Sequence, residues 1–155
     1  GSGILSAELA PFVNQIIGVD NSEPMLIAAE LRNDDEDNID LRKGELTALP
    51  IDDQSVAATL CVIVLSYIED PAAAIAEMAR VLKPGGRAVV IDLLAHNRDP
   101  FRRQMGQVHS GFTTDRLAEL FERAGLADTR CRPLPPAQDA TGPALVIATA
   151  SKPTD

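Results

Sequence analysis

Tryptophan is absent from the 155-residue sequence, and aromatic residues make up only 3% of it. With so few rings, the core must be aliphatic, and base stacking on an aromatic platform is a poor explanation of function. Positive charge is also scarce, since 14 Lys and Arg stand against 23 Asp and Glu for a net charge of −9. Such a charge repels phosphate backbones and anionic lipid, which argues against direct nucleic-acid binding.

Cysteine is limited to Cys61 and Cys131, which lie too far apart for a CxxC motif. A zinc site needs more soft ligands at short spacing, and a secreted disulfide scaffold needs more cysteines, so neither is expected. Two reduced thiols are typical of a cytoplasmic protein. The longest uncharged apolar stretch, Val56–Ile68, is too short for the roughly 20 residues that span a bilayer, and the sequence does not open with a signal-peptide pattern.

Apolar residues are plentiful at 45%, and their period alternates along the chain between that of a helix and that of a strand. Helices are expected over residues 4–13, 23–31, 70–82 and 113–124. Strands are expected over residues 15–20, 39–43, 56–65, 87–93, 127–134 and 144–150. This alternation predicts an α/β doubly wound sheet. The last two strands leave no room for a crossover helix, so they should be antiparallel.

Three local patterns make sharper predictions. Ser22 is expected to cap the second helix, with Met25 and Leu31 among the apolar residues on its inner face. The run Val56–Leu65 is almost entirely apolar and carries no charge, which predicts a strand buried on both faces. The segment Lys83–Gly86 is expected to end the third helix, because Pro and Gly cannot continue it.

In an open α/β sheet, ligands bind at the carboxyl ends of the strands. Gly1 and Gly3 would precede the first helix, where glycines let the backbone approach a ligand. Asp20 ends the next strand, at the position where an acid accepts hydrogen bonds from ribose hydroxyls. After the strand expected over 39–43, Glu45 could accept a bond from an exocyclic amine and Leu46 offers an apolar wall. Gly1-Ser2-Gly3 is either a cloning remnant or the middle of a motif.

Several segments in order resemble the motifs of class I S-adenosylmethionine-dependent methyltransferases. They are Gly1–Ser6, Ile17–Ser22, Gly44-Glu45, Leu49–Ile51 and Leu82–Gly86. The chain is similar to the small-molecule branch that includes the ubiquinone/menaquinone C-methyltransferases. Val64–Pro71 and His109–Phe112 resemble the methyltransferase domain fused to ArsR-type regulators.

The resemblance implies a Rossmann-like methyltransferase fold, a mostly parallel sheet with an antiparallel C-terminal strand in the order 3-2-1-4-5-7-6. It also implies a single S-adenosylmethionine-binding domain over residues 1–155, a small-molecule methyl acceptor, and either a homodimer or fusion to an upstream domain. The residues that would bind the cofactor by this resemblance are Gly1, Gly3, Asp20, Asn21, Met25, Glu45, Leu46, Cys61 and Val62. Gly1 and Gly3 would lie beside the methionine moiety, Asp20 would hold the ribose, and Asn21 and Met25 would line the adenosine.

This sequence departs from the family pattern in three places. The first strand and its acid are missing, because the chain starts inside the glycine loop. Ala57 stands where the family often has an acid, and Glu45 stands in place of the usual Asp. We expect the natural protein to continue upstream with an apolar strand, or to borrow one from a partner chain.

Rival readings fit less well. A nicotinamide dehydrogenase needs Gly or Ala at the third small position of its fingerprint, where Ser6 stands. A short-chain dehydrogenase needs a Lys four residues after its Tyr, and here Pro71 lies four residues after Tyr67. Base-modifying methyltransferases usually carry an Asn/Asp-Pro-Pro-aromatic segment, which is not found here. A second hypothesis is a non-catalytic cofactor-sensing or dimerisation module of a regulator.

Methyl transfer from a sulfonium needs positioning, exclusion of water and, for some acceptors, a base. The candidate general bases are the sequence's two histidines, His96 and His109, together with Asp92 and Tyr67. All four are also candidate substrate-binding residues. Each of these side chains follows or ends a predicted strand, or lies in the region expected to cover the site.

Overall fold

The computed structural model describes residues 1–135 and 141–154 of the chain. The chain divides into two compact units, residues 1–50 and residues 51–155. The first holds a two-stranded sheet and the second a four-stranded sheet. The expectation of one domain over the whole chain stays a prediction.

The first unit contains two helices, a short 3-10 helix and two strands. They are α1 (Ile4–Leu9), η1 (Ala10–Phe12), β1 (Ile16–Asp20), α2 (Glu23–Arg32) and β2 (Ile39–Lys43). β1 and β2 pair in parallel, with Asp20 opposite Lys43 at their carboxyl ends. Both strands were predicted from the sequence, and both are confirmed.

The predicted apolar face of α2 is partly wrong. Leu26 and Ala29 are buried, whereas Met25 is 45% and Leu31 79% exposed. A single helix over two strands covers only a narrow stripe of its own surface, so apolar residues beside that stripe stay open. Ser22 is the N-cap residue as predicted, but its side chain makes no capping hydrogen bond.

The second unit contains the remaining elements. They are β3 (Val56–Val62), η2 (Leu65–Tyr67), α3 (Pro71–Val81), β4 (Leu82–Leu93), α4 (Asp99–Met105), α5 (Thr114–Arg123), β5 (Ala127–Pro133) and β6 (Leu145–Ser151). Its sheet has the order β3-β4-β6-β5. β3 is parallel to β4, while β6 runs antiparallel to both β4 and β5. The predicted antiparallel pair at the C-terminus is therefore confirmed.

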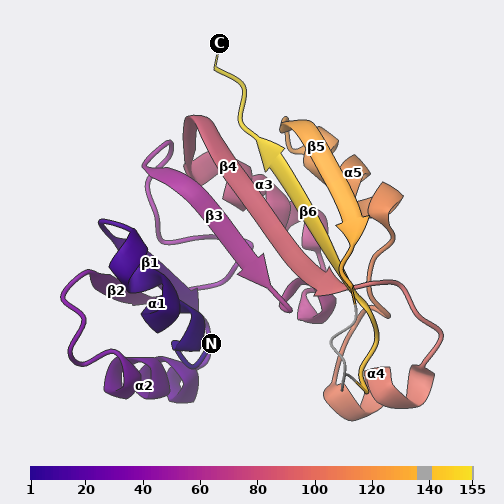
Figure 1. The fold of residues 1–155 in the computed structure, drawn as a ribbon, viewed down its shortest axis with the longest axis horizontal. Coiled ribbons are helices and arrows are strands. Elements are labelled where there is room, and N and C mark those ends of the chain that lie inside the picture. Colours follow the sequence, from indigo (N-terminus) through magenta and orange to yellow (C-terminus); the bar gives the residue numbers. More distant parts are fainter. Residues whose placement is uncertain (136–140, 155) are drawn as a thin grey trace. The chain divides into compact units, whose positions relative to one another are not determined.

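One face of this sheet packs on α3 and α5, which lie side by side behind it (Figure 1). Ile75 of α3, Phe121 of α5, Val90 of β4 and Val146 of β6 are all fully buried. Burying a large aliphatic or aromatic side chain contributes about 1.5–3 kcal/mol. This aliphatic layer is the core that the composition predicted.

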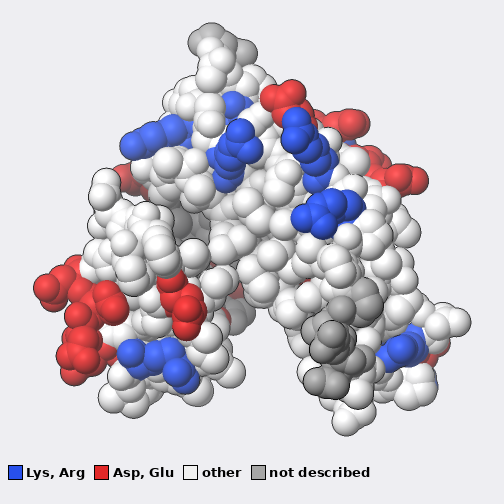
Figure 2. Space-filling view, in the orientation of Figure 1, with Lys and Arg blue, Asp and Glu red and all other residues white. Residues whose placement is uncertain are grey.

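The other face of the same sheet is rimmed by arginines. Arg87 lies opposite Ser151, and Arg130 and Arg132 lie opposite Thr149 and Ile147, so the three arginines share one face. Figure 2 shows Lys and Arg gathered where β4, β6 and β5 lie. The protein is thus acidic in sum but carries a local concentration of positive charge on this sheet.

β3 differs from its prediction. Cys61 is its one buried residue, and Leu60 is 44% exposed. The strand pairs only with β4 among the described residues. An edge strand with helices on one face cannot bury both of its faces, so the expectation of a doubly buried strand is wrong for this unit. The first strand expected beside β1 and β3 stays a prediction.

The helix end at Val81 is confirmed, but the segment after it is not a simple stop. Lys83–Gly86 forms the first part of β4, and Gly85 has a φ of +77°. The pairing jumps from Val56 opposite Leu82 to Ala58 opposite Arg87, so this segment bulges out of the ladder.

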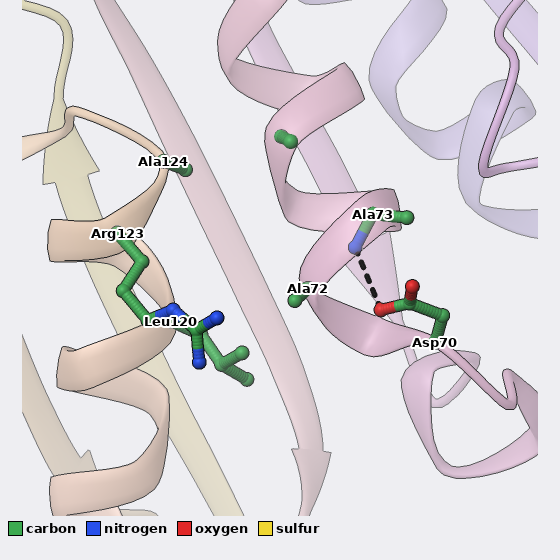
Figure 3. Close-up of a pocket in the computed structure, with 7 residues that line it drawn as sticks. Asp70, Ala72, Ala73, Leu120, Arg123 and Ala124 are labelled. Carbon is green, nitrogen blue, oxygen red and sulfur yellow. Dashed lines mark hydrogen bonds between the residues drawn. The ribbon is translucent and has the colours of Figure 1, made fainter.

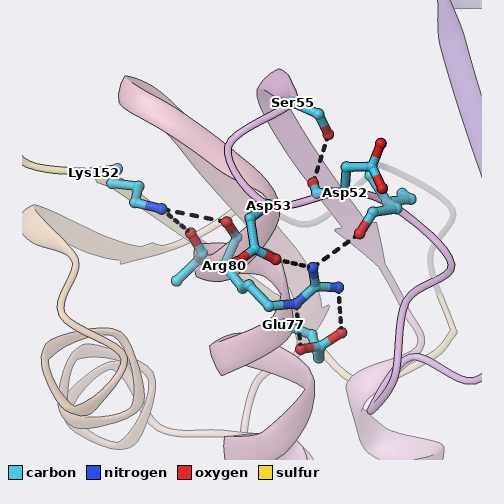
Figure 4. A network of polar contacts seen from close by, with 8 residues as sticks. Asp52, Asp53, Ser55, Glu77, Arg80 and Lys152 are labelled. Carbon is cyan, nitrogen blue, oxygen red and sulfur yellow. Dashed lines mark hydrogen bonds and ion pairs between the residues drawn. The ribbon is translucent and has the colours of Figure 1, made fainter.

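A polar network ties the start of β3 to α3 (Figure 4). Arg80 donates to the Ile51 carbonyl at 2.9 Å and forms ion pairs with Asp53 and Glu77. These two carboxylates raise the pKa of the Arg80 guanidinium. Lys152, the residue after β6, donates to the Ala79 carbonyl of α3 at 2.8 Å and so links the end of β6 to the same helix. The network is structural and lies before the start of β3, whereas Cys61 and Val62 are at the end of that strand. Among the described helices, none has the length and apolarity to cross a membrane.

Candidate functional site

Asp20 ends β1, and both oxygens of its carboxylate are engaged. Oδ1 accepts a hydrogen bond from the Ser22 backbone N–H at 2.8 Å, and Oδ2 contacts the Gly1 nitrogen. Burial raises the pKa of the Asp20 carboxyl, whereas hydrogen bonds from the Ser22 and Asn21 backbone lower it. The group is therefore ionised at neutral pH and acts as an acceptor.

Glu45 lies just past β2, beside Asp20. Its two oxygens accept hydrogen bonds from Asn21 Nδ2 at 3.3 and 3.1 Å. The Gly44 backbone N–H donates to the Asp20 carbonyl at 3.1 Å and continues the ladder between the strands. The structure thus brings Asp20, Asn21 and Glu45 together at one sheet edge, as the sequence predicted.

The glycines predicted for the cofactor loop lie beside this edge. Gly1 contacts Asp20. Gly3 has a φ of +76°, and a Cβ there would lie 2.9 Å from the Ala29 Cα. Only glycine fits both the left-handed backbone and this close approach to α2. The role of these glycines in binding stays a prediction.

Two apolar side chains complete the predicted set in the first unit. Met25 lies in the first turn of α2 and is 45% exposed, and Leu46 is half-buried after β2. Both leave apolar surface open in the unit that holds the polar edge. This combination can accept hydrogen bonds from a diol and an amine, and can contact a flat ring.

The second unit holds the other predicted residues. Cys61 and Val62 end β3, opposite Val90 and Ile91 of β4. Because successive residues of a strand point to opposite faces, Cys61 faces the helices while Val62 faces the arginine-rimmed side. The prediction that both border the methionine end of a cofactor is not tested by this placement.

The Cys61 thiol should be chemically inert. Burial and the charge of Asp92 raise its pKa to about 12, so only about one part in 10⁴ is thiolate at pH 8. Burial and Asp115 also raise the pKa of Cys131, but that side chain is less buried. In the native protein at pH 8 iodoacetamide should alkylate Cys131 long before Cys61, and the difference should vanish in urea. Mass spectrometry over time measures this, and equal native rates would contradict it.

Asp92 is completely buried near the end of β4, and so is Ser66 of η2. The Asp92 carboxyl accepts hydrogen bonds from Ser66 Oγ, from the Ser66 N–H at 3.3 Å and from the Leu93 N–H at 2.8 Å. Asp92 was predicted to bind substrate, but its side chain points into the protein. Ser66 was not singled out in the sequence, and nothing local distinguishes it from any other serine.

The two histidines lie in different surroundings within this unit. His109 Nε2 is 2.9 Å from the Ile68 carbonyl, and its ring lies 5.6 Å from that of Phe112. His96 Nδ1 accepts from the Arg98 N–H at 3.1 Å, while its Nε2 is buried without a partner in the described structure. Tyr67 is 37% exposed in η2 and stays a candidate contact.

Strained backbone marks the same region. Ile63, directly after β3, has a φ of +52° and donates to the Ile91 carbonyl at 2.7 Å. A β-branched residue in the left-handed region is a costly exception that tends to occur at functional sites. The sequence holds no signal for it.

A surface pocket of about 260 Å³ lies elsewhere, between α3 and α5 (Figure 3). It is lined mainly by alanines, with Leu120, Arg123 and Asp70. The Asp70 carboxylate already accepts from the Ala73 N–H at 3.0 Å as the cap of α3. None of the predicted site residues lines this pocket, and its chemistry offers little to a substrate.

Comparisons with known proteins agree with this picture. A family model described as a methyltransferase domain matches residues 1–90. The demethylmenaquinone methyltransferase of Clavibacter sepedonicus is 35% identical over 92 residues, which are 59% of this chain and 38% of that protein. The arsenite methyltransferase of Halobacterium salinarum is 29% identical over 126 residues, 76% of this chain and 32% of that protein.

A solved structure shares the fold over nearly the whole chain. It is an S-adenosylmethionine-dependent methyltransferase from Mesorhizobium loti, with a TM-score of 0.82, 18% identity, and coverage of 98% of this chain and 87% of that one. The chain spans well under half the length of the two curated relatives. The order of strands within each unit, β2-β1 and β3-β4-β6-β5, is that of the mostly parallel Rossmann-like sheet expected from the sequence.

Proposed function

Because the chain belongs to the methyltransferase domain family, whose model covers residues 1–90, we propose that it transfers a methyl group from S-adenosylmethionine to a small molecule. The observation that carries this proposal is the polar edge formed by Asp20, Asn21 and Glu45. Acceptors for ribose hydroxyls and for an adenine amine stand side by side there, after two parallel strands.

The residues present fit the adenosine end of that cofactor. The ionised Asp20 carboxylate would accept from the two ribose hydroxyls, and Glu45 would accept from the adenine amine, with Leu46 against the ring. Gly1 and Gly3 leave the backbone free of side chains where the methionine end would pass. When bound, the cofactor supplies an electrophilic methyl group on a sulfonium, so the protein's own tasks are to orient the acceptor and exclude water.

Two observations support a small acceptor over a nucleic acid. The net charge of −9 opposes a phosphate backbone. The segment after β3 is Leu65-Ser66-Tyr67-Ile68, which lacks the paired prolines typical of base-modifying enzymes. The named relatives that act on demethylmenaquinone and arsenite support the same choice.

The direct test is transfer of radiolabelled methyl from S-adenosylmethionine to an acceptor panel. We expect transfer to at least one phenol or thiol, for which catechol and thiophenol are the first probes. Calorimetry with S-adenosylhomocysteine measures binding in parallel. Tight binding without transfer across a broad panel would instead favour a cofactor-sensing module, and failure to bind would overturn the proposal.

A further inference from the structure

We propose that His109 Nδ1 is the atom that accepts the proton of the methyl acceptor, and that the buried Ser66–Asp92 pair positions it. This inference rests on the proposed function. It adds the atom that takes the proton, the tautomer of the His109 ring, and the residues that hold the ring in place. All of the groups involved belong to the second unit.

The hydrogen bond of His109 decides its tautomer. A carbonyl oxygen can only accept, so the 2.9 Å contact with the Ile68 carbonyl requires a hydrogen on Nε2. In the neutral ring Nδ1 then carries the lone pair. Nδ1 has no hydrogen-bond partner among the described residues, and the side chain is only half-buried. The ring therefore presents an open acceptor atom.

His96 has the same tautomer, but its lone pair is occupied. Its Nδ1 lone pair is occupied by the Arg98 N–H at 3.1 Å, so the hydrogen of the neutral ring is on Nε2. That atom is buried and has no partner within the described chain. His96 can therefore donate a hydrogen bond but has no lone pair free to take a proton. Of the two histidines, the geometry selects His109 as the candidate base.

Ser66 fixes His109 through the main chain. The Ser66 carbonyl accepts from the Val108 N–H at 2.9 Å and from the His109 N–H at 3.0 Å. Ile68, two residues further on, holds the His109 ring. The short segment 66–68 therefore holds both the backbone and the imidazole of His109, and any shift of that segment moves the ring.

Asp92 in turn fixes Ser66. Its fully buried carboxyl accepts from both the hydroxyl and the backbone N–H of Ser66. Burying a carboxyl group among neutral partners costs stability, and an apolar residue would fill the space without that cost. A buried carboxyl group that lowers stability is expected where that group is needed for function. Asp92 is accordingly a positioning residue, not a contact to the substrate.

The proton balance of the step is closed. The acceptor atom forms a bond to the methyl carbon, and the electron pair of the broken C–S bond stays on sulfur. The proton of the acceptor passes to Nδ1, which turns neutral His109 into imidazolium. The positive charge lost from the sulfonium thus reappears on the ring, and the Ile68 carbonyl accepts from an Nε2–H that is more polar than before.

The first test does not depend on activity. Two-bond ¹H–¹⁵N spectra at about pH 8.5, where imidazoles are generally neutral, report which nitrogen of each ring carries the hydrogen. With two histidines in the chain, His96→Ala alone assigns both signals. We expect His109 as a single Nε2–H tautomer in the wild type and as a mixture in Asp92→Asn and Ser66→Ala. Ser110→Ala, which removes a neighbouring hydroxyl, is the control and should leave the tautomer unchanged.

The second test is transfer of labelled methyl to catechol or thiophenol. His109→Ala should lower kcat about 10²- to 10⁴-fold with cofactor affinity nearly unchanged, and added imidazole should restore part of the rate. Asp92→Asn should lower kcat at least about tenfold, without rescue by imidazole. Wild-type rates in His109→Ala, or an Nδ1–H tautomer, would overturn the inference. If the wild type transfers no methyl group, the proposed function fails, and the tautomer spectra still decide whether Ser66 and Asp92 position His109.

Discussion

Replacing Asp20 with alanine should weaken the binding of S-adenosylhomocysteine roughly 5- to 150-fold. The expected loss is about 1–3 kcal/mol, the cost of leaving hydrogen-bonding hydroxyls without partners. The physical basis is the ionised state of Asp20, which makes its carboxylate a hydrogen-bond acceptor near neutral pH. Isothermal titration calorimetry measures the change directly.

The pH dependence of this binding follows from the same carboxyl group. Because backbone hydrogen bonds from Ser22 and Asn21 lower the pKa of Asp20, the charge and the stability it contributes are present above the ordinary value of that pKa. They are lost as the pH falls through the lowered pKa. Affinity should therefore be flat through neutral pH and decline only in strongly acidic solution.

The matched control is Asp35→Ala, which removes an exposed carboxylate from the loop between α2 and β2. It changes the net charge of the same unit by the same amount, so it should leave the affinity unchanged if Asp20 acts by direct contact. Equal affinities of wild type and Asp20→Ala, or binding of NAD in place of S-adenosylhomocysteine, would show that this sheet edge is not the S-adenosylmethionine site.

Gly111→Ala should destabilise the fold by about 2–5 kcal/mol. Gly111 has a φ of +79°, and a Cβ there would lie 2.6 Å from both the Leu93 and the Leu94 carbonyl oxygens. Left-handed backbone costs an alanine about 1–2 kcal/mol, and overpacking against main-chain atoms adds about 1–3 kcal/mol. Urea unfolding monitored by circular dichroism gives the difference.

Gly106→Ala separates these two contributions. Gly106 has a φ of +69° after α4, but its Cβ would meet nothing within 4 Å. The variant should therefore show only the left-handed cost of about 1–2 kcal/mol. If both variants unfold at the same urea concentration, the backbone at the end of β4 moves to make room for the Cβ at position 111. That result would also weaken the argument that the segment around His109 is held in place.

The larger outlines of the fold were available in the sequence. The strands predicted over 15–20 and 39–43 are β1 and β2, and the helix predicted from residue 70 is α3, which Asp70 caps. Propensity, capping and periodicity act over a few residues, so they leave a local record. The exception is α4 (Asp99–Met105), which lies in a stretch too polar to give a clear helical period.

Burial was predicted less well than element type. The run Val56–Leu65 is apolar enough for a strand covered on both sides, yet β3 is an edge strand with Leu60 44% exposed. An apolar composition shows that a strand can be buried on both faces, whereas the elements packed against it determine which of its side chains are buried. The same reason explains why Met25 and Leu31 are open on α2.

The sequence by itself determined the candidate cofactor edge, because Asp20 and Glu45 each follow a recognisable strand and parallel pairing aligns such ends. It also named both histidines, but it left them equivalent. Only the tertiary structure distinguished them, by placing Ile68 on His109 Nε2 and Arg98 on His96 Nδ1. Ser66 and Asp92 are 26 residues apart and meet through the packing of η2 against the end of β4. Contacts between residues so far apart depend on how strands and turns pack in three dimensions, and no short segment of the sequence predicts that packing.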